Sequence, residues 1–139
     1  MTQQGTIHAT TVAIDGRAVM LLGPSGSGKS DLALRLIDRG AALVSDDYTR
    51  IERSDDMLMA SAPSTIAGKM EVRRLGIIPI DHVNDVAVAL AVRLQHNGER
   101  MPERQTEQFL GVPIRILILD PRPASAPLIV EHALRHDLP

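Results

Sequence analysis

The sequence contains no cysteine and no tryptophan, and it contains one tyrosine, Tyr48, and one phenylalanine, Phe109. Without cysteine the chain forms no disulfide, no thiolate metal site and no cysteine nucleophile. With so few aromatic rings it offers no stacking platform of the kind that binds single-stranded nucleic acid. Its core must therefore be built from Leu, Ile, Val, Ala and Met.

An excess of one charge and a long apolar run are also missing. The chain has 15 Lys and Arg against 17 Asp and Glu, which argues against a broad basic face for nucleic acid. The longest uninterrupted apolar run, Val86 to Val92, is far shorter than the ~20 residues that span a membrane. The N-terminal residues show neither the basic segment nor the apolar segment of a secretory signal peptide. We therefore expect no nucleic-acid or membrane partner, and we expect a cytoplasmic protein.

The length and the apolar content, 139 residues and 44%, are typical of one folded domain. We expect a single domain over residues 1–139. Asp15-Gly16 and residues 54–56 are hairpin turn signals between apolar runs. The apolar pattern predicts strands at residues 6–14, 18–22, 41–45, 48–53, 57–61, 75–80, 86–95 and 112–119.

Helices are fewer in the predicted structure. Apolar residues at helical spacing predict one over 30–39, which Gly40 would end. A second helix is predicted after Ser125, a candidate cap. Residues 64–70 predict at most one helical turn, and residues 97–107 no clear element. The predicted fold is α/β, a mixed sheet with a few covering helices.

A phosphate-binding motif lies between the second predicted strand and the first predicted helix. Its residues satisfy the pattern G-x-x-x-x-G-K-[ST] and are Gly23, Pro24, Ser25, Gly26, Ser27, Gly28, Lys29 and Ser30. Such glycines let successive backbone N–H groups converge on phosphate oxygens, and the helix N-terminus adds partial positive charge. Lys29 would neutralise the β- and γ-phosphates, and the Ser30 hydroxyl would bind Mg²⁺. The alternative, a glycine-rich turn before a helix, is poorly compatible with the complete pattern in this context.

The phosphate-binding motif alone does not name a reaction. An antiparallel partner strand is predicted before the loop, unlike the usual βαβ arrangement. Neither N-K-x-D nor D-x-x-G occurs in the sequence, which disfavours a guanine-nucleotide switch protein.

Two adjacent carboxylates, Asp46 and Asp47, follow the predicted strand over 41–45. A carboxylate at such a strand end can reach Mg²⁺ or a nucleophile. Since neighbours on extended backbone point to opposite sides, we expect at most one of them near the γ-phosphate. A solvated turn is the alternative interpretation.

For several other polar residues, the sequence pattern alone leaves both a functional and a structural interpretation open. His8 lies on the strand expected beside the loop and could be structural. Glu71 and Arg73 belong to a charge cluster that could be a solvated face. Arg104 could supply the cation that phosphoryl transfer requires, or be an ordinary loop residue.

Several of these motifs, in order and at matching spacing, resemble the catalytic domain of bacterial HPr kinase/phosphorylase from about Ile7 to Arg135. The shared features are a histidine ahead of a G-x-S-G-x-G-K-S loop, a helix ending in Arg-Gly, an Asp-Asp strand end and a Glu-Ile-Arg-Gly-Leu-Gly-Ile-Ile signature. They correspond here to His8, Gly23–Ser30, Arg39-Gly40, Asp46-Asp47 and Glu71–Ile78. This sequence differs in having Arg74 where the family usually has Gly, and Glu103 where it usually has Asp.

The resemblance implies a mixed P-loop sheet related to phosphoenolpyruvate carboxykinase. It implies transfer of phosphate from ATP, with Mg²⁺, to a seryl residue of an HPr-like phosphocarrier. It also implies reversal by inorganic phosphate to give pyrophosphate. A homo-oligomer, typically a hexamer, is implied too, whereas we expect no counterpart of the family's additional N-terminal domain.

The resemblance further implies roles for individual residues. Asp47 corresponds to the general base, and His8, Lys29 and Arg104 to further catalytic residues. Ser30 and Glu71 correspond to Mg²⁺ ligands, and Asp46 and Arg73 are expected to support the site. Two other functions stay open: a small-molecule P-loop kinase, for which this chain has little room, and a non-enzymatic ATP-binding sensor.

Overall fold

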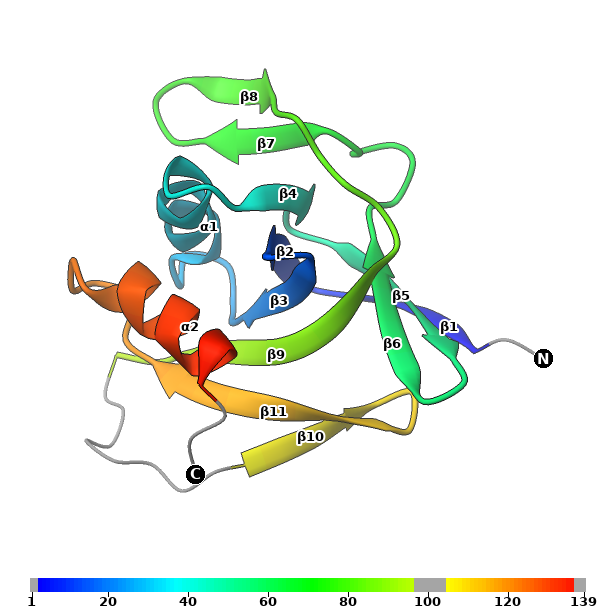
Figure 1. The fold of residues 1–139 in the computed structure, drawn as a ribbon. Helices are drawn as coiled ribbons and strands as arrows, with labels where there is room; N and C mark the ends of the chain where they lie inside the picture. The colour runs from blue at the N-terminus through cyan, green and yellow to red at the C-terminus, as the bar shows by residue number, and fades with distance from the viewer. Residues whose placement is uncertain (1–2, 97–104, 137–139) are drawn as a thin grey trace.

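The computed structural model describes residues 3–96 and 105–136. Figure 1 shows the arrangement of its strands and helices. In chain order these are β1 (Gln4–Ile7), β2 (Ala9–Ile14), β3 (Arg17–Leu22), α1 (Lys29–Asp38), β4 (Ala42–Ser45), β5 (Thr49–Ser54), β6 (Met57–Ser61), β7 (Lys69–Val72), β8 (Gly76–Pro79), β9 (Val86–Leu94), β10 (Gln105–Phe109), β11 (Val112–Leu119) and α2 (Ala126–Arg135). No helix in these ranges is long and apolar enough to cross a membrane.

The described strands form one large mixed sheet and one small hairpin, which confirms the predicted α/β fold. The large sheet has the order β1-β5-β6-β9-β3-β2-β4, and β11 adds to β9 and carries β10. Strand β9 runs parallel to β3 and β11 and antiparallel to β6. The predicted β2–β3 hairpin is confirmed, so the strand before the phosphate-binding loop has an antiparallel partner that precedes it.

Both faces of the central strands are buried, which explains their nearly continuous apolar sequence. One face, with Val19 and Leu21, packs against Leu32 and Leu36 of α1 and against α2. The opposite face forms a second apolar cluster with β5, β6 and β11. In Figure 1 both helices lie on the same side, and the β7–β8 hairpin lies above α1 and β4.

A shift in the register of β9 explains how one strand serves both clusters. Ala18 pairs with Val88 while Val19 pairs with Leu90, so β9 has one extra residue there. An extra residue reverses the alternation of side chains. Val88 accordingly packs in the second cluster, whereas Leu90 packs beneath the helices.

Helix α1 ends as its sequence predicts. Gly40 has a φ of 111°, its N–H donates to the Ile37 carbonyl at 3.0 Å, and the Ala41 N–H donates to the Leu36 carbonyl at 3.0 Å. This pair of bonds satisfies the last carbonyls of the helix and turns the chain towards β4. The α1 C-terminus therefore delivers the chain directly to the strand that carries the two carboxylates.

Three predicted segments differ from the structure. The strand predicted over 6–14 is broken at His8, because β1 pairs with β5 whereas β2 pairs with β3 and β4. The helical turn considered at 64–70 is a turn followed by β7, which pairs with β8 in the small hairpin. Strand β10 begins inside the segment 97–107 that lacked a clear pattern. The side chains of β10 are exposed apart from Phe109, so its sequence has no alternation of apolar and polar residues. The strand forms because it pairs with β11.

Candidate active site

The phosphate-binding loop connects β3 to α1, and its glycines are required by their backbone conformation. Gly28 precedes α1 with a φ of 103°. A Cβ at Gly23 would lie 2.5 Å from the Ser27 hydroxyl oxygen, which is closer than any real contact. The loop is therefore tightly closed, and its backbone N–H groups and the start of α1 can bind an anion.

Lys29 lies inside this loop. Only 6% of the residue is exposed, and its ammonium donates to the carbonyls of Gly23 at 2.6 Å and Pro24 at 3.0 Å. Burial lowers the pKa of Lys29, and the nearby carboxylates of Asp47 and Asp46 partly oppose that shift. A positive charge is thus held where an anionic ligand of the loop would lie.

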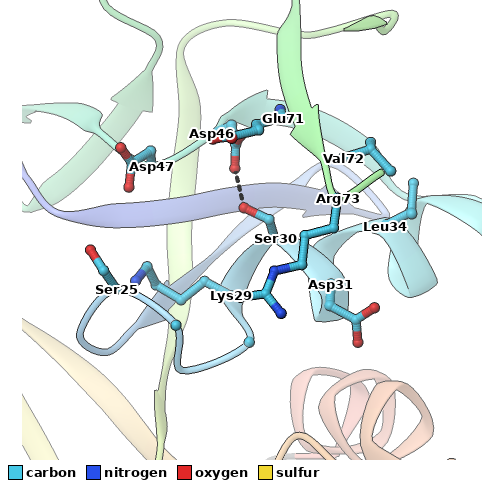
Figure 2. Close-up of a pocket in the computed structure, with 12 residues that line it drawn as sticks. Ser25, Lys29, Ser30, Asp31, Leu34, Asp46, Asp47, Glu71, Val72 and Arg73 are labelled. Atoms are coloured by element: carbon cyan, nitrogen blue, oxygen red, sulfur yellow. Dashed lines mark hydrogen bonds between the residues drawn. The ribbon is translucent and has the colours of Figure 1, made fainter. Parts of the chain in front are cut away.

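Asp46 is buried and receives three hydrogen bonds. Its Oδ1 accepts from the Ser30 hydroxyl at 2.7 Å and from the Thr10 hydroxyl at 3.2 Å. Its Oδ2 accepts from the backbone N–H of Glu71 at 3.0 Å. The Asp46 carboxylate therefore joins α1, β2 and β7, and Figure 2 shows its bond to Ser30 at the head of the helix.

Asp47 is exposed and points to a different partner. Its Oδ1 lies 2.8 Å from His8 Nε2, and the two side chains are 57% and 35% exposed. Its φ is 69°, and the Tyr48 N–H donates across it to the Asp46 carbonyl at 2.8 Å. Together these features define a γ-turn of the strained, positive-φ kind. The two carboxylates have different partners, but the extended backbone assumed in the prediction is wrong, because this turn separates them.

These groups surround a cavity of about 640 Å³. Most of the labelled side chains in Figure 2 point into or line this space. The lining residues are Ser25, Gly26, Gly28, Lys29, Ser30, Asp31, Leu34, Asp46, Asp47, Glu71, Val72 and Arg73. A second cavity of about 420 Å³ is lined by His8 and by Gly23 and Pro24 of the same loop. The His8–Asp47 bond therefore connects the two cavities.

The oxygen donors at the head of α1 fit a Mg²⁺ ion. The Ser30 hydroxyl and the carboxylates of Asp46 and Glu71 are hard ligands, and all three residues line the larger cavity. In the described ranges, no three His, Asp or Glu side chains converge as a complete metal site. Mg²⁺ commonly takes one or two carboxylates and completes its shell with water and substrate phosphates, which matches the donors available here.

The structure brings together most of the residues that the sequence predicts for the site. His8, Lys29, Ser30, Asp46, Asp47, Glu71 and Arg73 all lie at the two cavities. Arg104 lies outside the described residues.

Sequence reasoning did not select Thr10, Asp31, Leu34 or Val72. Three of them had a local signal. Asp31 and Leu34 lie in the first turns of α1, directly after the loop. Thr10 is two residues after His8, and residues two apart on a strand share a face. The expected roles of all these residues remain predictions.

Comparisons with known proteins extend this description. A family model described as "HPr Serine kinase C-terminal domain" matches residues 1–136. An HPr kinase/phosphorylase of Clostridium botulinum is 31% identical over 141 residues, which cover 91% of this chain and 46% of the relative. One from Caldanaerobacter subterraneus is 35% identical, over 94% of this chain and 48% of the relative.

A solved structure also matches. The Hpr(Ser) kinase/phosphatase from Coxiella burnetii is 31% identical with a TM-score of 0.82, over 94% of both chains. The curated relatives are longer, and the chain spans about half of their length.

Proposed function

The chain belongs to the family of HPr serine kinase C-terminal domains, and from this premise we propose that it transfers the γ-phosphate of ATP to a seryl residue of an HPr-like phosphocarrier. Mg²⁺ and ATP are the proposed cofactors. We also propose the reverse reaction, in which inorganic phosphate removes the seryl phosphate as pyrophosphate, and a homo-oligomeric, hexameric assembly.

The observation that carries the proposal is the position of Asp47 beside the phosphate-binding loop. Its carboxylate lines the same cavity as Lys29 and Ser30, and it bonds to His8 at 2.8 Å. It is an exposed carboxylate, so an incoming hydroxyl can reach it. A general base must lie within hydrogen-bond reach of the proton it accepts, and this arrangement supports that role.

The two cavities suggest separate approaches for the two substrates. The nucleotide would occupy the larger cavity, with its phosphates on the loop and Lys29. The seryl side chain would enter beside His8 through the smaller cavity, which is lined by Leu22, Arg93 and Phe109 among others. Both substrates would then meet at Asp47, which is the requirement for an in-line transfer.

The proposed transfer forms one O–P bond and breaks another. The seryl oxygen attacks the γ-phosphorus and forms a new O–P bond while the bond to the β-phosphate oxygen breaks and ADP leaves. Asp47 accepts the seryl proton, and His8 holds the Asp47 carboxylate in place. Lys29 stabilises the charge that develops on the phosphoryl oxygens. Mg²⁺, when held by Ser30 and Glu71, would supply further charge stabilisation and orient the phosphates.

In the reverse direction, a phosphate oxygen attacks the seryl phosphorus and the O–P bond to serine breaks. Pyrophosphate leaves, and Asp47 takes the proton that the attacking phosphate loses and passes it to the seryl oxygen. The same carboxylate thus acts as base in one direction and acid in the other.

The test uses the purified chain, γ-labelled ATP, Mg²⁺ and a purified HPr-like carrier. The expected product is acid-stable label on a seryl residue of the carrier. Asp47→Asn should lower the transfer rate by about 10²–10⁴-fold while calorimetry shows ATP binding unchanged. Asp55→Asn is the matched control, because Asp55 is also exposed and has a positive φ, 54°, in the remote β5–β6 turn.

Other outcomes would overturn the proposal. Label confined to small metabolites would indicate a small-molecule kinase. ATP binding without transfer to any acceptor would indicate a nucleotide sensor. Full activity in Asp47→Asn would remove this residue as the base.

A further inference from the structure

We propose that Thr10 is a positioning residue, whose single hydroxyl sets the place of Asp47 relative to the phosphate-binding loop. This inference rests on the proposed transfer reaction. Thr10 is completely buried and lies on β2, which pairs with both the strand before the loop and the strand before Asp47. It lines neither cavity, so it would act only through the Asp46 carboxylate and the Asp47 backbone.

The Thr10 hydroxyl makes two bonds with opposite polarity. It donates to Asp46 Oδ1 at 3.2 Å and accepts the backbone N–H of Asp47 at 3.0 Å. A hydroxyl has one hydrogen to donate, so the bond to Asp46 orients its lone pairs towards the Asp47 N–H. One atom therefore joins the carboxylate that holds Ser30 to the backbone of the proposed base.

Asp47 needs such a contact because its backbone is strained. Aspartate tolerates a positive φ, but a γ-turn with a positive φ is strained and rare, so contacts around the turn must hold it. Its side chain is largely exposed, so packing does not enforce the turn. His8 bonds to the Asp47 carboxylate, and two further bonds hold the backbone after Asp47: the Tyr48 N–H donates to the Asp46 carbonyl, and the Ser45 hydroxyl donates to the Tyr48 carbonyl. Thr10 is the partner that holds the Asp47 N–H itself.

The expected consequence is specific to the rate of transfer. Without the hydroxyl, the Asp47 N–H has no acceptor there and the turn can relax, which moves the carboxylate away from the acceptor oxygen. The loop and Lys29 do not depend on that N–H, and Asp46 loses its longest bond, at 3.2 Å, but keeps those from the Ser30 hydroxyl and the Glu71 N–H. Nucleotide binding should therefore stay intact while kcat falls, since a displacement of about 1 Å costs about 10²-fold.

Two substitutions test the hydroxyl. Thr10→Val keeps the shape of the side chain and removes the hydroxyl. It should lower kcat by about 10- to 100-fold with the KM for ATP within about 3-fold of wild type. Thr10→Ser restores the hydroxyl and should return kcat to within about 3-fold of wild type. If Thr10→Val does not fold, Thr10→Ala is measured in its place.

The matched control is the next residue. Thr11 is also completely buried, but its hydroxyl bonds to Thr49 Oγ1 at 2.8 Å on the opposite face of β2. Thr11→Val removes the same group from the same strand, and should lower the melting temperature as Thr10→Val does. Its kcat should stay within about 2-fold of wild type, since the bond it loses does not reach Asp47.

Amide hydrogen exchange gives a readout that does not depend on activity. The Asp47 N–H should exchange faster in Thr10→Val and at the wild-type rate in Thr11→Val and Thr10→Ser. An unchanged kcat, or an unchanged Asp47 amide, would overturn the inference. So would a loss of ATP binding that parallels the loss of kcat. If the wild-type protein transfers no phosphate, the proposed function fails, while the exchange rates still test whether Thr10 holds Asp47.

Discussion

Asp46 and Asp47 are adjacent and carry the same charge, yet we expect the same substitution to affect them in opposite ways. The perturbation is Asp→Asn at each position in turn. Asp46 is 7% exposed and accepts three hydrogen bonds, whereas the Asp47 side chain is 57% exposed. Stability should therefore depend on Asp46, and catalysis on Asp47.

The magnitude at Asp46 follows from its donors. An asparagine has one carbonyl oxygen, so its NH₂ group must face either the Glu71 N–H or the hydroxyls of Ser30 and Thr10, all of which donate to Asp46. At least one hydrogen bond to a charged group is lost, at about 1.5–3 kcal/mol, and a buried donor is left unpaired. We expect Asp46→Asn to lower the free energy of unfolding by about 3 kcal/mol, or the melting temperature by roughly 10 °C.

At Asp47 the same substitution should change stability by less than about 0.5 kcal/mol. Asparagine adopts a positive φ readily, and an exposed pair such as Asp47 with His8 contributes little to stability. The backbone bond from the Asp47 N–H to Thr10 does not involve the side chain. The variant should be as stable as wild type and should still bind ATP.

Urea unfolding at neutral pH, followed by circular dichroism, measures both differences. Calorimetry with ATP and Mg²⁺ adds a second readout, in which Asp46→Asn should bind more weakly because the Ser30 hydroxyl loses its fixed acceptor. The reasoning is refuted if Asp46→Asn unfolds at the same urea concentration as wild type. It is equally refuted if Asp47→Asn is the less stable of the two.

Two further predictions concern the loop and its surroundings. The Ser27 hydroxyl is buried without a hydrogen-bond partner, so Ser27→Ala should raise the free energy of unfolding by about 1 kcal/mol. Ser25 is exposed, and the control Ser25→Ala should change the free energy of unfolding by less than half as much. A loss of stability in Ser27→Ala would contradict the prediction. Hydrogen bonds from Arg122 lower the pKa of Asp120 from 3.8 to about 2, so the stabilising effect of Asp120 is present above pH 4 and is lost as the pH falls towards 2. In urea titrations, the free energy of unfolding of Asp120→Asn should therefore fall less steeply between those pH values than that of wild type. Identical slopes would exclude the Asp120–Arg122 bond as a cause of the wild-type decline.

Several features of the fold could be predicted because their causes are local. Gly40 ends α1 at the predicted place, since its positive φ is needed within one turn of the helix. The β2–β3 turn at Asp15-Gly16 follows from two adjacent residues that accept positive φ. Strand β10 had no comparable signal, because its side chains are mostly exposed and its hydrogen bonds come from β11.

The phosphate-binding loop shows how far consecutive residues alone can specify a site. Eight neighbouring positions contain the glycines, the lysine and the hydroxyl, and the strand and helix on either side set the geometry of the loop. The sequence also shows the pair Asp46-Asp47 directly after a predicted strand. It does not show which of the two bonds to Ser30 and which is exposed.

That choice depends on contacts between residues far apart in the chain. His8 meets Asp47 across 39 positions, and Thr10 meets Asp46 across 36, because β2 and β4 pair antiparallel with a shift in register after Thr11. Strand pairing and its irregularities decide which side chains share a face, and neither is encoded in any short stretch. Local sequence thus specified the glycine-rich loop between β3 and α1, whereas the long-range packing of β2 against β4 buried the Asp46 carboxylate against Ser30 and left the Asp47 carboxylate exposed beside His8.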